Sequence, residues 1–325
     1  MKAVVYTRYG PPDVLELKEI AKPLPKDNEV LVKVHAASVN PADWHLVRGE
    51  PFLVRLMGYG FLKPRNQIPG CDIAGRVEAV GRFAKQFQPG DDVFGDISRS
   101  GGGGFAEYVS VPEDALALKP TGMPFEEAAA APLAAMTALQ GLRDKGRISA
   151  GEKVLINGAG GGVGMFAVQI AKSFGAEVTG VCSKKKLDIV RSIGADYVID
   201  YTRVDFTQDR KRYDLILDTA AHHSILDCKR ALNAKGIYVL VGGPMASVYQ
   251  TMLLGPWVSM GSRKMGTLMA KANKKDLLIV KELLEAGKVK PVIDRRYALS
   301  EVPEALRYLE EGHAQGKIVI TVQPQ

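Results

Sequence analysis

The hydrophobic pattern of the chain changes character near Pro124. Before this point, short apolar runs are separated by Gly and Pro, which is typical of strands joined by turns. The strands predicted there are 30–34, 75–80, 91–94 and 105–111. After it, the Ala-rich stretch 126–142 predicts one long helix that begins close to Pro124.

From Lys153 onward, short apolar runs alternate with helical patterns. The predicted strands are 153–157, 177–181, 197–199, 215–218 and 237–241, and the predicted helices are 164–174, 184–193 and 223–232. This rhythm predicts a parallel sheet covered by helices on both faces. Helices at 274–285 and 302–310 precede a last strand at 317–322, which we expect to join the N-terminal strands.

Small residues fill the connection between the predicted strand 153–157 and the helix after it. Ala159, Gly161 and Gly164 stand at the spacing of the dinucleotide fingerprint, where small residues allow a tight turn and a close approach to a pyrophosphate. The N–H groups at the start of the helix would then face the phosphate charge. A flexible surface loop is the alternative, but it does not explain why the glycines lie between two well-patterned elements. The predicted cofactor-binding residues of this loop are Ala159, Gly160, Gly161, Gly162, Val163 and Gly164.

Composition narrows the class of protein. A chain of 325 residues predicts two domains, since single cores rarely exceed about 250–300 residues. No apolar run reaches the roughly 20 residues that span a bilayer. The first residues enter a strand pattern at once, so we expect no secretory leader. Cys71, Cys182 and Cys228 form no metal-binding or disulfide motif, which favours a reducing, cytoplasmic location.

The net charge of +7 has two open interpretations. The first interpretation is that the charged residues lie on an ordinary solvated surface, because acidic residues accompany the basic ones through most of the chain. Attraction of an anionic cofactor, or peripheral contact with an anionic membrane, is the other. The interleaved aromatic and basic residues of a nucleic-acid platform are missing, so no nucleic-acid partner is expected.

Several segments, in order along the whole chain, resemble one family. Besides the glycine loop, they are 38–44, 69–75, 80–81, 89–95, 102–108, 130–139 and 312–318. With them the chain resembles the zinc-free quinone oxidoreductases of the medium-chain dehydrogenase/reductase superfamily, in the branch of the chloroplast-envelope homologues. The resemblance implies an α/β fold in which a Rossmann-type doubly wound parallel sheet is inserted in a β-rich GroES-like catalytic domain, with the active site in the cleft. The implied ranges are 123–288 for the dinucleotide-binding domain, and 1–122 with 289–325 for the catalytic domain. It also implies a homodimer through an edge strand within 261–270.

Zinc-dependent relatives place a cysteine ligand where this chain has Asn40, and a His-Glu pair where it has Cys71 and Asp72. Asn is a poor zinc ligand, and Cys71 alone cannot build a site, so no metal is expected. Without a Lewis acid to activate an alcohol, hydride donation to an already electrophilic acceptor becomes the expected chemistry. Quinones and conjugated enals or enones are such acceptors.

Asn40 and His45 are the candidate catalytic residues. The Asn40 amide could donate a hydrogen bond to a developing oxyanion; the alternative is a turn residue held by Pro41. His45 occupies the place of a tyrosine in several relatives and could supply a proton, or it could be structural. Trp44 and Phe52 offer flat apolar surfaces for a quinone ring, or core packing.

NADPH is the predicted cofactor. The strand 177–181 runs into Ser183 and three lysines instead of the acid that accepts from the ribose of NAD. The resemblance assigns the 2′-phosphate to Lys186 and Tyr201, and it places Thr137, Gly242 and Gly243 near the nicotinamide and His222 near the ribose. The expected function is therefore NADPH-dependent reduction of quinones or activated double bonds. The alternatives are an NADPH-binding protein without turnover, such as a crystallin or an RNA-binding protein, and a zinc-type alcohol dehydrogenase.

Overall fold

The computed structural model describes residues 1–52, 54–56 and 60–323, and these residues form two compact units. The first unit contains Met1–Ala134, Ala272–Glu285 and Pro291–Gln325; the second contains Ala135–Lys271 and Ala286–Lys290. Both ends of the chain thus belong to the first unit. The first unit also holds helices α2 (Phe125–Ala129) and α8 (Lys274–Glu285), which the boundaries drawn from the sequence give to the nucleotide-binding domain.

The first unit is built on a seven-stranded sheet. Its strands, in spatial order, are β14 (Ile293–Ala298), β15 (Lys317–Thr321), β3 (Glu29–Val39), β4 (Asp72–Val80), β5 (Asp92–Asp96) and β7 (Leu116–Leu118), and β6 (Tyr108–Pro112) pairs with β3. A separate small sheet holds β1 (Lys2–Val5) and β2 (Glu16–Glu19), and the other helices are α1 (Pro41–Arg48) and α9 (Val302–Glu310).

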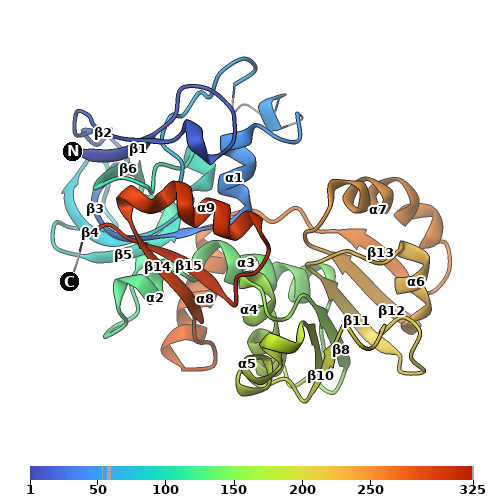
Figure 1. The fold of residues 1–325 in the computed structure, drawn as a ribbon. Coiled ribbons are helices and arrows are strands. Elements are labelled where there is room, and N and C mark those ends of the chain that lie inside the picture. The colour runs from blue at the N-terminus through green and yellow to red at the C-terminus, as the bar shows by residue number, and fades with distance from the viewer. Residues whose placement is uncertain (53, 57–59, 324–325) are drawn as a thin grey trace. The chain divides into compact units, whose positions relative to one another are not determined.

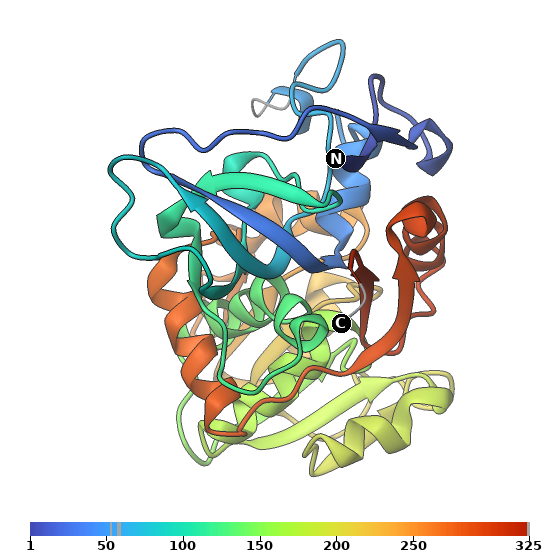
Figure 2. The ribbon, with the colours of Figure 1, turned by 90° about the vertical axis from the view of Figure 1, so that its left-hand side faces the viewer.

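The last strand joins the N-terminal strands, as predicted. β15 pairs antiparallel with β3, so that Ile318 lies opposite Val39. Figure 2 shows this strand, in dark red, beside the blue β3. Apolar side chains of both strands enter one core with α9, which explains why the two chain ends fold together.

The second unit contains a six-stranded, fully parallel sheet (Figure 1). Its spatial order is β10 (Tyr197–Asp200), β9 (Glu177–Cys182), β8 (Lys153–Asn157), β11 (Tyr213–Asp218), β12 (Leu232–Leu240) and β13 (Lys264–Thr267). Its helices are α4 (Gly162–Ser173), α5 (Leu187–Ser192), α6 (Ile225–Arg230) and α7 (Met245–Val258), together with α3 (Pro132–Gln140) from Ala135 onward. This order is that of the Rossmann fold, so the predicted fold class is confirmed.

The single long helix predicted for 126–142 is wrong. The chain forms α2, then α3 from Pro132, and ends in a π-helical turn at Gly141–Lys145. Pro132 has no N–H group and its ring opposes a continuous helix at this point. The break leaves the N–H group of Leu133 available, and it donates to Asp72 Oδ1 at 2.9 Å.

Helix α7 was not predicted from the sequence. Its residues are apolar on all sides, so apolar and polar positions do not alternate with the period of a helix. It contains Pro256 and covers one side of β13. Within the described residues, no helix has the length and apolarity needed to cross a membrane.

Candidate functional site

The glycine loop has the geometry that its sequence predicts. Gly158 follows β8 with φ +82°, a conformation that favours glycine. A Cβ on Gly164 would lie 2.1 Å from the carbonyl oxygen of Gly158, so α4 can pack this closely on the loop only with glycine. Gly161 stands at the N-cap of α4 and no side chain caps the helix. The first N–H groups of α4 therefore remain available to an anion.

Asp218 organises the sheet edge beside this loop, and sequence reasoning missed it. It ends β11, is fully buried, and accepts hydrogen bonds from Asn157 Nδ2 at 2.9 Å and Tyr238 Oη at 3.0 Å. The N–H groups of Ala220 and Ala221 also donate to it, at 3.0 and 2.7 Å. The bond between Asn157 and Asp218 joins β8 to β11, the pair at which the strand order reverses and where ligands bind in such sheets. An acid at the end of a buried apolar strand was the available signal.

Most of the other predicted cofactor residues follow strands at the same edge. Ser183 follows β9, His222 follows β11, and Gly242 and Gly243 follow β12. Gly243 has φ +122°, and a Cβ there would lie 2.5 Å from the Cβ of Ala221. Thr137 lies on α3 and is buried.

The basic residues predicted to bind a 2′-phosphate lie beside the loop. The Lys186 side chain covers Gly160, where an added Cβ would meet Lys186 Cδ at 2.5 Å. Tyr201 is 58% exposed, and its N–H group donates to the Cys182 carbonyl at 3.2 Å. An acid is also close to this edge, since Asp200 pairs in register with Cys182.

The carboxylate of Asp200 has partners of its own. The Thr202 hydroxyl donates to Asp200 Oδ1 at 2.8 Å, and Arg203 lies 3.9 Å from Oδ2. The hydrogen bond from Thr202 and the charges of Arg203 and Lys184 lower the pKa of this carboxyl. Its negative charge is thus partly balanced by cations at the same edge.

The first unit contains a buried polar cluster around Asn40, the first predicted catalytic residue. Asn40 is only 1% exposed and connects β3 to α1. Its Nδ2 donates to Asp72 Oδ2 at 2.9 Å and to the Ser38 carbonyl at 3.3 Å, while Lys317 Nζ donates to its Oδ1. Both amide hydrogens of Asn40 are therefore directed at protein oxygens.

Lys317, also missed from the sequence, supplies the positive charge of this cluster. It lies on β15, is almost fully buried, and its Nζ is 3.7 Å from Asp72 Oδ2. Burial lowers the pKa of Lys317, and the nearby Asp72 opposes that shift. The sequence signal for it was a charged residue at the first position of a buried apolar strand, directly after Gly316.

Two further carboxyls in the cluster, those of Asp43 and Asp96, form no ion pair within the part of the chain that the structure describes. Burial raises the pKa of Asp43 to about 6, although the N–H group of Asn40 donates to its Oδ2 at 2.8 Å. Burial and the neighbouring Asp72 raise the pKa of Asp96 to about 7. The folded state therefore favours the protonated form of both groups more than the unfolded chain does.

Asp72 and Cys71, which stand where zinc-dependent relatives have metal ligands, are buried and surrounded by other groups of the protein. Asp72 accepts from Ser38 Oγ at 2.8 Å, from Asn40 and from the N–H group of Leu133. Cys71 is completely buried, and burial raises the pKa of its thiol well above the ordinary value. Over residues 1–52, 54–56 and 60–323, no group of three or more His, Cys, Asp or Glu residues is arranged to hold a metal ion.

His45, the second predicted catalytic residue, is half-buried on α1. Its Nδ1 lies 2.7 Å from the Glu50 carbonyl, and its ring stacks on Trp44 at 3.7 Å between centroids. Because a carbonyl can only accept, Nδ1 carries a hydrogen and Nε2 of the neutral ring is an acceptor. Burial lowers the pKa of His45, which reduces the fraction able to donate a proton from Nε2 at neutral pH.

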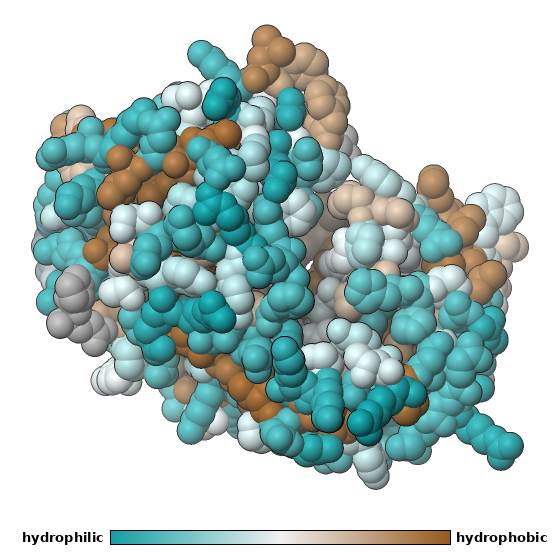
Figure 3. Space-filling view, viewed as in Figure 1, coloured by the Kyte–Doolittle hydropathy of each residue, from teal (hydrophilic) through white to brown (hydrophobic). Residues whose placement is uncertain are grey.

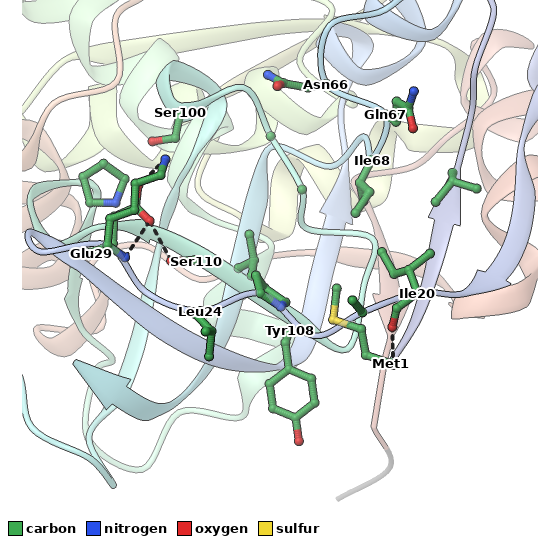
Figure 4. A pocket seen from close by; sticks show the side chains of 18 of the residues that line it. Met1, Ile20, Leu24, Glu29, Asn66, Gln67, Ile68, Ser100, Tyr108 and Ser110 are labelled. Atoms are coloured by element: carbon green, nitrogen blue, oxygen red, sulfur yellow. Dashed lines mark hydrogen bonds and ion pairs between the residues drawn. The ribbon is translucent and has the colours of Figure 1, made fainter. Parts of the chain in front are cut away.

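A pocket of about 720 Å³ opens elsewhere in the first unit (Figure 4). Met1, Ile20, Leu24 and Tyr108 form part of its lining. Glu29, at the start of β3, accepts a hydrogen bond from Ser110 Oγ at 2.8 Å on its wall. Neither Asn40 nor His45 lines this pocket, so it is distinct from the predicted catalytic residues.

Comparison with known proteins places the chain among dehydrogenases and reductases. Residues 26–121 match the family described as alcohol dehydrogenase GroES-like domain, and residues 193–320 match the family described as zinc-binding dehydrogenase. The NADPH-dependent alkenal/one oxidoreductase of Arabidopsis thaliana chloroplasts is 36% identical, over 98% of this chain and 79% of that protein. The chloroplast envelope quinone oxidoreductase homolog of the same plant is 34% identical, over 98% of each chain. The structure of a quinone oxidoreductase from Coxiella burnetii superposes with a TM-score of 0.87 at 30% identity, over 99% of both chains.

These relatives contradict the predicted cytoplasmic location. The two plant relatives are named for the chloroplast, and a mouse relative that is 34% identical is named a mitochondrial NAD(P)H oxidoreductase. The prediction was wrong because free cysteines indicate a reducing environment, and that chemistry does not distinguish one reducing compartment from another.

Proposed function

The chain belongs to the quinone oxidoreductase family of the medium-chain dehydrogenase/reductase superfamily, and we propose that it reduces quinones and α,β-unsaturated carbonyl compounds with NADPH. The observation that carries this proposal is the glycine loop at the strand-order reversal, with Lys186 lying over it and an uncapped helix behind it. The printed names of the relatives, which include quinone and alkenal/one oxidoreductases, support this acceptor class.

The second unit would hold the cofactor. The N–H groups at the start of α4 would bind the pyrophosphate, and Gly161 would let the backbone approach it. Ser183, Lys186 and Tyr201 would hold the 2′-phosphate. The carboxylate of Asp200 would repel this phosphate, and the guanidinium of Arg203, 3.9 Å from that carboxylate, would attract it. When bound, the nicotinamide supplies the hydride.

The reaction proposed here does not use zinc. Asp72 is saturated with donors, and the Cys71 thiol is held in its protonated form by burial, so neither offers a ready ligand. Carbonyl polarisation then has to come from the acceptor itself, through conjugation. Quinones and enones meet this condition, whereas simple alcohols do not.

Asn40 remains the proposed donor to the oxygen that gains charge during reduction. In the structure this requires one of its two hydrogen bonds to be replaced, and the bond to the Ser38 carbonyl, at 3.3 Å, is the longer. Lys317 and Asp72 would hold the rest of the amide in place. His45 is a candidate for the proton only in its charged form, because its neutral ring donates at Nδ1 to Glu50.

We also propose a homodimer that pairs the free edges of β13. This strand ends the six-stranded sheet, and its outer edge has no partner among the described residues. Free strand edges are natural sites of pairing with a second copy. Size-exclusion chromatography with light scattering tests this proposal, and a monomer at micromolar concentration would reject it.

The proposed reaction is tested with the purified chain, NADPH and a panel of quinones, enals, enones and simple alcohols. NADPH oxidation with the conjugated acceptors only is the expected result. NADPH binding without oxidation of cofactor by any acceptor would instead indicate a binding protein. Asn40→Ala should lower turnover by about 10²–10³, as loss of one oxyanion donor typically does, while NADPH affinity stays close to that of the parent.

A further inference from the structure

One wall of the pocket in the first unit is apolar. Met1, Ile20 and Ile68 line the pocket, are only partly buried, and pack on the small core around Val5. Leu24 also lines the pocket and is 85% exposed. In Figure 3, brown side chains lie at the upper left, in the region where Figure 1 shows β1 and β2, the strands beside Met1 and Ile20. The fold thus leaves apolar surface open to solvent, and a ligand that covers it would gain hydrophobic free energy.

The facing part of the lining is polar and basic. Figure 4 shows Asn66 and Ser100 in its upper part, whereas Met1, Ile20 and Leu24 lie in its lower part. Asn66 follows Arg65 in the chain, and Ser100 follows Arg99, so both guanidinium groups come from the segments that form this polar end.

The glycine run 101–104, which the nucleotide site does not use, adds a backbone donor to this end. Gly102 N donates to the Ile97 carbonyl at 3.2 Å, and Gly104 N donates to the Gly70 carbonyl at 3.0 Å. Gly103, between them, is buried and lines the pocket, and its N–H group meets no acceptor within the described residues. Because buried backbone N–H groups are almost always paired, we expect an acceptor from outside the chain at this position.

The balance of charge indicates the kind of acceptor. Glu29 is the one acidic side chain that lines the pocket in the described part of the chain, and it already accepts from Ser110 Oγ at 2.8 Å and from Lys26 Nζ at 3.3 Å. Neither Arg65 nor Arg99 forms an ion pair with any residue that the structure describes. The lining therefore keeps an excess of positive charge on two guanidinium groups, which pair best with carboxylates and phosphates.

We propose that this pocket binds an amphipathic anion, with an acidic head group on an aliphatic chain. The head group would accept hydrogen bonds from Arg65, Arg99 and the N–H group of Gly103, and the chain would lie on Ile20 and Leu24. The volume of about 720 Å³ falls within the roughly 300–1,000 Å³ that is typical of small-molecule sites. The site contains neither Asn40 nor the glycine loop of the second unit, so it is separate from the proposed reductase activity.

Calorimetric titration of the full chain with short aliphatic compounds tests the proposal. Octanoate should bind at one site, and octanol, which has the same chain without the charge, should bind about tenfold more weakly or less. The affinity should rise about two- to fourfold for each methylene added from hexanoate to octanoate, and it should fall as salt is raised. Equal affinities for octanol and octanoate would overturn the proposal.

Substitutions locate the site. The double substitution Arg65→Ala with Arg99→Ala should raise the Kd for octanoate by about tenfold or more, whereas Arg82→Ala, at an exposed arginine outside the pocket, should not change it. Leu24→Asp brings a negative charge to the pocket without touching the core and should raise the Kd by about fivefold or more. Its matched control is Leu62→Asp, at a leucine that is 84% exposed and does not line the pocket. Circular dichroism would establish that all chains are folded.

The same variants separate this site from the reductase site. With NADPH and a quinone, the Arg65/Arg99 and Leu24 variants should turn over like the parent. Octanoate binding that is unchanged in both of these variants would contradict the proposal. So would octanoate binding that is lost in Asn40→Ala and kept in the Arg65/Arg99 variant, because the anion would then occupy the acceptor site.

Discussion

Alanine substitutions at Gly161 and Gly164 separate the two tasks of the nucleotide loop. The two residues are three positions apart, at the start of α4. At Gly164 a new Cβ would lie 2.1 Å from the Gly158 carbonyl oxygen and 2.8 Å from the Ala159 Cα. At Gly161 the nearest atom, the same carbonyl oxygen, would be 3.5 Å away, and the backbone (φ −97°, ψ 175°) suits alanine.

The distances set the expected magnitudes. At Gly164 the overlap exceeds 1 Å against an ordinary contact of about 3.4 Å, and backbone atoms cannot rotate away. Overpacking of this kind costs about 1–3 kcal/mol of unfolding free energy, and the shifted loop should also weaken NADPH binding. Gly161→Ala should leave stability within about 0.5 kcal/mol, since a small capping loss is offset by a less flexible unfolded chain. Its methyl group would nevertheless meet the pyrophosphate and raise the Kd for NADPH by about tenfold, or 1.4 kcal/mol.

Two measurements on each variant are sufficient: Tm by calorimetry and the Kd for NADPH by fluorescence titration. Gly261→Ala is the control, because a Cβ at that position would have no atom within 4 Å and the residue lies outside β13. The expected pattern is a lower Tm and a higher Kd for Gly164→Ala, and a higher Kd with an almost unchanged Tm for Gly161→Ala. An unchanged Kd in Gly161→Ala would refute the placement of the pyrophosphate at this loop.

Three further predictions concern the phosphate of the cofactor, the absence of zinc and a buried carboxyl. Lys186→Ala should raise the KM for NADPH by roughly 10–100-fold, through loss of about 1.5–3 kcal/mol, and leave that for NADH nearly unchanged; equal efficiency of the parent with both cofactors would contradict the assignment. Elemental analysis should find no stoichiometric zinc and chelator should not reduce activity, and one zinc per chain whose removal abolishes turnover would be the opposite result. Because burial and Asp72 raise the pKa of Asp96 to about 7 from 3.8, its contribution to stability is present below about pH 4 and lost as pH rises toward 7. Asp96→Asn should therefore increase the free energy of unfolding at pH 8 by about 1–3 kcal/mol and change little at pH 4; a denaturation profile identical to that of the parent at both pH values would disprove this.

The sequence predicted those elements that depend on local pattern. The strand 153–157 has the predicted bounds, α8 and α9 coincide with the predicted helices, and β15 joins β3 as expected. In each case hydrophobic periodicity and turn residues act within one short segment. The family resemblance supplied the domain order, which periodicity alone does not give.

The features of the candidate site that could not be predicted are hydrogen bonds between residues that lie far apart in the sequence. Lys317 and Asn40 are 277 residues apart, and Asp218 and Asn157 are 61 apart, yet each pair is joined by a hydrogen bond. No local pattern reports a partner at such separation. The break at Pro132 was visible as a proline, but its consequence, the bond from Leu133 to Asp72, again depends on a distant residue.

The direction of hydride delivery tests the proposed function most directly. The enzyme would be given an enone and NADPH carrying deuterium at the transferred position, and the product would be analysed by NMR. The account predicts a saturated ketone with deuterium on the carbon β to an intact carbonyl. An allylic alcohol with deuterium on its carbinol carbon would contradict it, because that product requires activation of the carbonyl rather than of the conjugated double bond.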